Sequence, residues 1–106
     1  MRKYETLILF SPDLNSEERQ AILSDLNGVV SNRSGQVIET DDWGLRELAY
    51  PVQKYTRGHY IRLEYGADGD AVYEIERKLR IAEGVFKFLT VKLADAFQPA
   101  EAQEEV

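Results

Sequence analysis

Residues 43–65, WGLRELAYPVQKYTRGHYIRLEY, hold the end of one strand pattern and the whole of the next. Residues 59–65 alternate strictly, so a strand here would carry Ile61, Leu63 and Tyr65 on one face. No helical spacing separates the two patterns. The stretch therefore predicts two consecutive strands in the middle of the chain, joined without a helix.

The earlier of these two strands is expected to begin at residues 36–41. It can run on, bent, through residues 43–50, because Gly44 allows a bulge. Pro51 has no N–H to donate to a ladder, so we expect residues 52–58 to form a loop. A strand-loop-strand unit results.

The flanking segments each combine a strand and a helix. Apolar residues recur at helical spacing from Ile22 to Val30 and from Val72 to Leu79. The outer predicted elements are a strand at residues 3–10, a helix from Asn15 or Ser16 to about Asn32, a helix from Asp68 or Asp70 to near Gly84, and a strand at residues 85–92.

The order strand, helix, strand, strand, helix, strand is the split βαβ pattern of ferredoxin-like folds. We therefore predict an α+β domain over residues 1–97. Its sheet has four antiparallel strands, the first and third lie in the centre, and two helices cover one face. Residues 98–106 hold three Glu and little to bury, and are expected to form a disordered acidic tail.

Composition excludes several classes of protein. The 106 residues contain no Cys, which excludes disulfides, thiolate metal sites and cysteine nucleophiles, and fits a reducing cytoplasm. The apolar run that ends before Ser11-Pro12 is too short for a signal peptide or a membrane span.

The net charge of −6 argues at first against nucleic acid. The charge is uneven, however: residues 43–65 hold four Lys or Arg and two Glu, or +2. They also hold six aromatic side chains if His59 is counted. The acidic run of Glu39, Asp41 and Asp42 stands against an RNA-binding surface here.

The first and last strands are apolar on both faces, although two helices can cover only one. We expect the even residues of the first strand to face the helices. An exposed apolar patch would then mark an interaction surface, unless it forms a dimer of sheets or the bent second strand covers it. The predicted face comprises Leu7, Leu9, Tyr60, Leu89 and Val91, fringed by Arg62 and Lys87.

No catalytic constellation is evident, and no cofactor or metal is expected. His59 is the only histidine and has no nucleophile motif beside it, while Asp41 and Asp42 would point to opposite faces of a strand. Residues 57–61 fail the RNA-recognition-motif signature after two positions, so RNA contact should be by shape and backbone.

The chain resembles the bacterial small-subunit ribosomal protein S six family over about residues 1–93. The motif G-L-R-x-L-A-Y-P-V-x-K is met from Gly44 to Lys54, and a second match runs from Leu79 to Lys92. The resemblance implies a cytoplasmic, ribosomal protein, not an enzyme. Such a protein binds the central domain of small-subunit ribosomal RNA together with small-subunit protein S eighteen.

On this resemblance we predict phosphate contacts by basic residues and stacking or hydroxyl contacts by tyrosines, although Tyr4 could equally belong to the core. The alternatives are a ferredoxin-like regulatory module that dimerises through its open sheet and binds a small metabolite, or an acyl phosphatase. The acidic segment after the first strand disfavours the latter. The predicted RNA-binding residues are Arg2, Tyr4, Arg46, Tyr50, Lys54 and, more weakly, Lys92.

Overall fold

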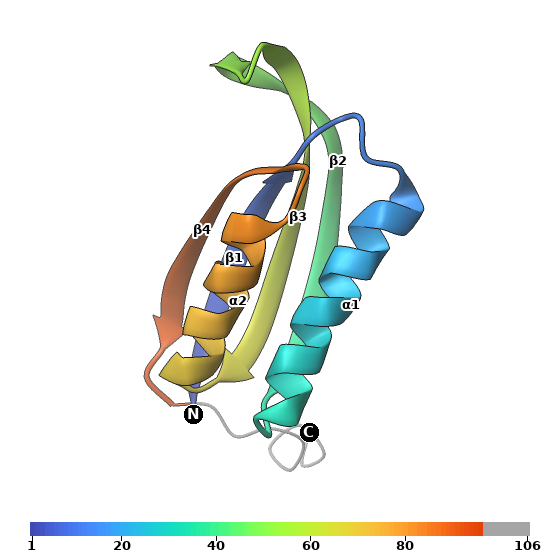
Figure 1. Ribbon diagram of the computed structural model, residues 1–106. Coiled ribbons are helices and arrows are strands. Elements are labelled where there is room, and N and C mark those ends of the chain that lie inside the picture. The colour runs from blue at the N-terminus through green and yellow to red at the C-terminus, as the bar shows by residue number, and fades with distance from the viewer. Residues whose placement is uncertain (97–106) are drawn as a thin grey trace.

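The computed structural model describes residues 1–96, in which one antiparallel sheet carries two helices on a single face (Figure 1). The strand order is β2-β3-β1-β4, so the first and third strands lie in the centre, as predicted. The ferredoxin-like α+β class is confirmed. The tail predicted at residues 98–106 lies outside the described residues. The elements are β1 (Arg2–Phe10), α1 (Ser16–Asn32), β2 (Gln36–Val52), β3 (Tyr55–Ala67), α2 (Gly69–Ile81) and β4 (Val85–Ala94).

Both helices begin at side-chain caps that the sequence allowed. The Asn15 side chain accepts from the Glu18 N–H at 2.8 Å, and the Glu18 carboxylate accepts from the Asn15 N–H at 3.0 Å. This reciprocal pair is a capping box. At α2, the Asp68 carboxylate accepts from the Ala71 N–H at 2.8 Å. Each cap satisfies backbone donors that would otherwise lack a partner.

The core lies between the sheet and the helices, and the predicted parity is confirmed. Even residues of β1 face the helices, and Ile8 is paired with Ile61 in a fully covered layer. The Tyr65 hydroxyl lies 2.9 Å from Thr6 Oγ1, which lies 2.9 Å from Thr90 Oγ1. Burial raises the pKa of Tyr65 to about 12, so its proton remains available for this chain of hydrogen bonds.

β2 and β3 extend past the end of β1 as a two-stranded arm, residues 45–58, which projects beyond the rest of the molecule (Figure 1). The prediction of a loop at residues 52–58 is wrong, because β2 runs to Val52 and β3 resumes at Tyr55. Pro51 is tolerated because β2 is an edge strand, with one side free of ladder hydrogen bonds.

The arm turns on Gln53 and Lys54, whose φ angles are +49° and +72°. Positive φ at both central residues is the signature of a type I′ hairpin turn, which normally uses Asn or Gly. The turn could not be recognised from this sequence because neither residue type favours that region. Gly44, with φ of +81°, lies at a register shift between β2 and β3, and its predicted bulge is confirmed.

Candidate RNA and protein interfaces

The arm brings together three predicted RNA-binding residues, Arg46, Tyr50 and Lys54. All three are exposed, and Tyr50 retains 61% of its accessible surface. The arm contains three basic residues and one acid, which gives 3 − 1 = +2. The basic and aromatic enrichment seen in the sequence is therefore concentrated at one projecting end of the molecule.

Two contacts hold the arm against the body of the protein. The Lys87 ammonium of β4 donates to the Tyr50 hydroxyl at 2.6 Å and lies 4.6 Å from the centre of its ring. The Tyr55 hydroxyl donates to the Asp13 carboxylate, which raises the pKa of Tyr55. The Tyr55 ring centre lies 5.3 Å from that of Phe86. The arm is thus tied to the loop after β1 and to the start of β4.

Arg2 and Lys92 lie at the other end of the sheet from the arm. Arg2 begins β1 opposite Ala67. At about 3.3 Å per residue, the strand carries it roughly 25 Å from Phe10, beside which the arm starts. Lys92 is engaged by Asp95 at 2.5 Å, and this contact lowers the pKa of Asp95. The predicted RNA-binding residues do not form one patch.

The sequence left Tyr4 open between an RNA contact and the core, and the structure places it in the core. Only 8% of Tyr4 is exposed, and its ring stacks on Tyr65 with the centres 5.9 Å apart. The register places it on the face that the helices cover, with Ile8 on the same side of β1. The Tyr4 ring therefore has no exposed face on which an RNA base could stack, and Tyr4 is a core residue.

The sheet face opposite the helices presents the predicted apolar side chains. Leu7 is paired with Leu89 on β4, and Leu9 with Tyr60 on β3. Leu89 is 63% exposed and Val91 is 42% exposed. The face is hollowed here by a shallow pocket of about 180 Å³, lined by Leu7, Leu9, Tyr60, Lys87, Phe88 and Leu89.

The sequence predicts that Leu9 is exposed on the partner face, but only 4% of its surface remains accessible. Its side chain lies over Gly58, where an added Cβ would come within 2.3 Å of Leu9 Cδ1. A second hollow of about 130 Å³ joins Leu9 and Tyr60 to the arm residues Leu48 and Tyr50. Leu9 forms the floor of the face, and Leu89 and Val91 form its accessible part.

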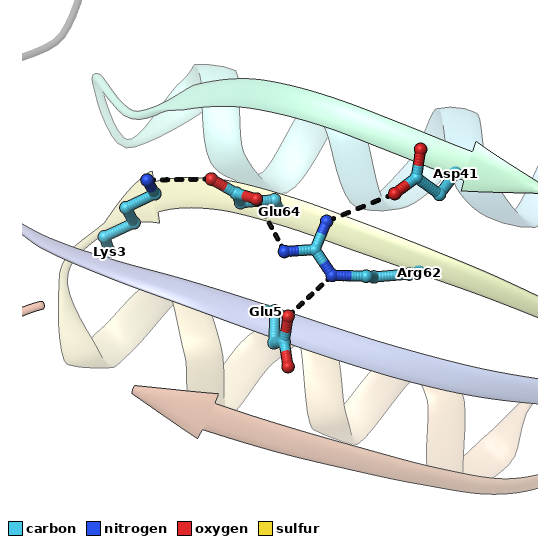
Figure 2. A network of polar contacts seen from close by, with 5 residues as sticks. All are labelled: Lys3, Glu5, Asp41, Arg62 and Glu64. Carbon is cyan, nitrogen blue, oxygen red and sulfur yellow. Dashed lines mark hydrogen bonds and ion pairs between the residues drawn. The ribbon is translucent and has the colours of Figure 1, made fainter. Parts of the chain in front are cut away.

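Arg62 lies on the same face but is already occupied by carboxylates, as Figure 2 shows. Its guanidinium donates to Glu5 at 2.6 Å, to Glu64 at 2.6 Å and to Asp41 at 3.3 Å. Lys3 lies 2.9 Å from the other Glu64 oxygen. Lys3 and Arg62 lower the pKa of Glu64, and Glu64 and Glu5 raise that of Arg62. The network crosses three strands and encloses the arginine charge.

The sequence model described as Ribosomal protein S6 matches residues 3–92. The chain belongs to the ribosomal protein S6 family. It is 57% identical over 98 residues to small ribosomal subunit protein bS6 of Nitratidesulfovibrio vulgaris (strain Miyazaki F), covering 92% of this chain and 97% of that one. It is 51% identical to the bS6 of Solidesulfovibrio magneticus, over 96% of this chain and 100% of the relative.

Solved structures agree on the fold of this S6 family member. The 30S ribosomal protein S6 of Thermotoga maritima superimposes with a TM-score of 0.78 at 24% identity, over 86% of each chain. The C-terminal domain of the MgtC protein from Mycobacterium tuberculosis reaches 0.62 at 9% identity, over 92% of this chain and 93% of that one. The fold is therefore shared more widely than the ribosomal role, which rests on the sequence family.

Membership of the S6 family makes this chain a small-subunit ribosomal protein, a component of the cytoplasmic ribosome and not an enzyme. Within residues 1–96, no three His, Asp or Glu side chains gather as metal ligands. No helix in that range is long and apolar enough to cross a bilayer.

Sequence reasoning missed the contacts that join distant segments of this S6 family member. Trp43 is 42% exposed, and its ring centre lies 6.3 Å from that of Tyr60. Lys87 lies at the fringe of the open face, as expected, but it also binds Tyr50. The alternation of charged residues on β3 was a usable signal for the Arg62 network, but their partners depend on register.

Proposed function

We propose that this protein binds the central domain of small-subunit ribosomal RNA together with small-subunit protein S eighteen. The arm contacts the RNA, and the open sheet face contacts the protein. The observation that carries the proposal is the spatial separation of the two surfaces: the arm carries +2, whereas the open face is apolar with acidic residues beside it.

The arm suits a phosphate backbone. Arg46 donates its Nε–H to the Trp43 carbonyl at 3.0 Å, which fixes the side chain and leaves its terminal N–H groups for a ligand. Lys54 occupies a left-handed turn position where glycine would be less strained. A strained residue that carries a charge at the tip of a projecting hairpin is a reasonable candidate for function. Tyr50 offers an exposed ring and hydroxyl beside them.

Arg2 and Lys92 would form a second, separate RNA contact at the far end of the sheet. A protein that touches RNA at two ends recognises the shape of a folded RNA more than a sequence. Lys92 would have to exchange Asp95 for a phosphate, so its contribution should be the smaller of the two.

The open face suits a protein. Leu7, Leu89 and Val91 provide apolar surface, and Leu7 and Leu89 line a hollow that a partner side chain can fill. Such a patch on a small domain is typical of an interface. A basic partner would also offset this chain's net charge of −6 and share the electrostatic work of RNA binding.

The test measures binding of a central-domain RNA transcript in the presence of S eighteen between about 50 and 200 mM KCl. Arg46→Ala and Lys54→Ala should each lower the slope of log affinity against log salt by about 0.7–0.9. Arg77→Ala on α2, an exposed base engaged by Glu74, is the matched control and should leave the slope unchanged.

Unchanged slopes in both arm variants would remove the arm from the RNA interface. Cosedimentation with the small subunit separates the proposal from the alternative of a metabolite-binding module. A protein that stays in the supernatant as a dimer free of RNA would favour that module.

A further inference from the structure

The open sheet face is divided into an apolar half and a charged half. One cross-strand row runs Leu89, Leu7, Arg62, Asp41 from β4 through β1 and β3 to β2. The two leucines occupy one side of the row, and the two charged residues the other. Because neighbouring strands lie about 4.8 Å apart, Leu7 and Asp41 are roughly 10 Å from each other.

The charged half is left with an excess of negative charge. Four carboxylates, those of Glu5, Glu39, Asp41 and Glu64, face two cations, Lys3 and Arg62, which gives 2 − 4 = −2. Asp41 holds the longest of the Arg62 contacts, 3.3 Å against 2.6 Å for Glu5 and for Glu64. The surplus therefore lies towards β2.

Glu39 is the exposed part of that surplus. It lies opposite Glu64 in the β2–β3 ladder and makes no ion pair within residues 1–96. Like charges opposite each other on a sheet are unfavourable unless a cation lies between them. The hydrogen bond and charge of Asp41 raise the pKa of Glu39, as expected for carboxylates crowded together without enough cations.

We infer that the open face selects a basic segment of its protein partner: an apolar side chain fills the hollow at Leu7 and Leu89, and a Lys or Arg about 10 Å away pairs with Glu39 and Asp41. This inference rests on the proposed function, because it specifies the chemistry of S eighteen at that same face. Residues i and i+3 of an extended segment span about 10 Å, as do i and i+7 of a helix.

A nucleic acid is the less suitable occupant. Phosphates would be repelled by the surplus charge at Glu39 and Asp41. The hollow around Leu7 and Leu89 is lined mainly by apolar side chains and offers few hydrogen bonds to a nucleotide. The positive charge that RNA requires lies on the arm instead.

The test is calorimetric titration of S eighteen into the Glu39→Gln, Asp41→Asn double variant of the full chain. Arg62 keeps its two shorter contacts in this variant, so the fold should persist. Affinity should fall about 10-fold at low salt, and the loss should shrink as salt screens the lost attraction. The Asp25→Asn, Glu83→Gln control removes two exposed charges from other surfaces and should bind as the unmodified chain does.

The outcomes separate the two proposals. If the unmodified chain does not bind S eighteen, the proposed function fails and this inference fails with it. If the double variant, like the control, binds as the unmodified chain does at every salt concentration, this inference alone is overturned. If the double variant instead binds central-domain RNA more tightly than the control does in the absence of S eighteen, the face lies against RNA and the inference is wrong.

The exposed single variant Glu39→Gln provides a second measurement should the double variant fold poorly. It should show about a 3-fold loss at low salt, and full retention of affinity would count against the inference. Because the chain contains no cysteine, Glu39→Cys can also carry a photo-crosslinker at one site. The crosslinked segment of S eighteen should contain Lys or Arg; an acidic or uncharged segment would contradict the pairing.

Discussion

Replacing Arg62 by Met removes a charge from the centre of the sheet while it keeps an unbranched apolar side chain there. Arg62 is 19% exposed and Glu64 is 11% exposed, so their pair lies between a surface salt bridge and a buried one. Exposed pairs contribute about 0–1 kcal/mol, and breaking a buried pair costs about 3–5 kcal/mol. With two contacts of 2.6 Å lost, we expect the free energy of unfolding at neutral pH to fall by about 2 kcal/mol.

The loss should depend on pH with a defined sign. Lys3 and Arg62 lower the pKa of Glu64 below its ordinary value of 4.5. A carboxylate with a lowered folded-state pKa stabilises the fold above its unfolded pKa, and this contribution disappears as pH falls through the folded value. Once Glu64 is protonated, Arg62 loses that anion as a partner. The difference between Arg62→Met and the unmodified chain should therefore be smaller near pH 3 than near pH 7.

Urea denaturation at about pH 7 and about pH 3 measures both values, provided that the m-values agree. Arg77→Met is the control, because Arg77 is 47% exposed and its pair with Glu74 on α2 should contribute little at either pH. A loss that is equal at the two pH values, or equal for the two arginines, would refute the reasoning about the network.

Four further substitutions test the arm and the open face. Lys54→Gly should raise the free energy of unfolding by about 0.5–1 kcal/mol, because glycine adopts a φ of +72° without a Cβ clash, and it should still weaken RNA binding. Leu89→Asp should change the free energy of unfolding by less than about 0.5 kcal/mol, since Leu89 is 63% exposed, yet abolish S eighteen binding. Leu9→Asp should lower the free energy of unfolding by about 3 kcal/mol or more. Equal losses of stability in the two variants would contradict this contrast. Gly58→Ala should cost about 1–3 kcal/mol because its Cβ would meet Leu9 at 2.3 Å, and thermal denaturation unchanged from the parent would show that Leu9 can move aside.

Local patterns in the sequence were sufficient for the architecture. The element order follows from two helical periodicities and four strand patterns. Residue type limited the caps to Asn15 or Ser16 and to Asp68 or Asp70, and the structure uses Asn15 and Asp68. The parity of Ile61 and Leu63 followed from strict alternation, because successive strand residues point to opposite faces. The apolar second face also followed, since two helices cannot cover both sides of a sheet.

Boundaries and turns at the arm could not be read in the same way. Pro51 would break a central strand, but β2 proved to be an edge strand, and that is a property of the assembled sheet. The turn at Gln53 and Lys54 uses a backbone region that these residue types rarely adopt.

The composition of the site was encoded locally, and its arrangement was not. Arg46, Tyr50 and Lys54 are close in sequence and remain close in space. Arg62, by contrast, meets Glu5 and Asp41 across separations of 57 and 21 residues. Periodicity determines which face of a strand a side chain occupies, but only the register between strands determines what stands beside it. The tertiary structure alone therefore decided that the core would enclose Tyr4, that Leu9 would be covered, and that one sheet face would carry an apolar half next to an acidic half.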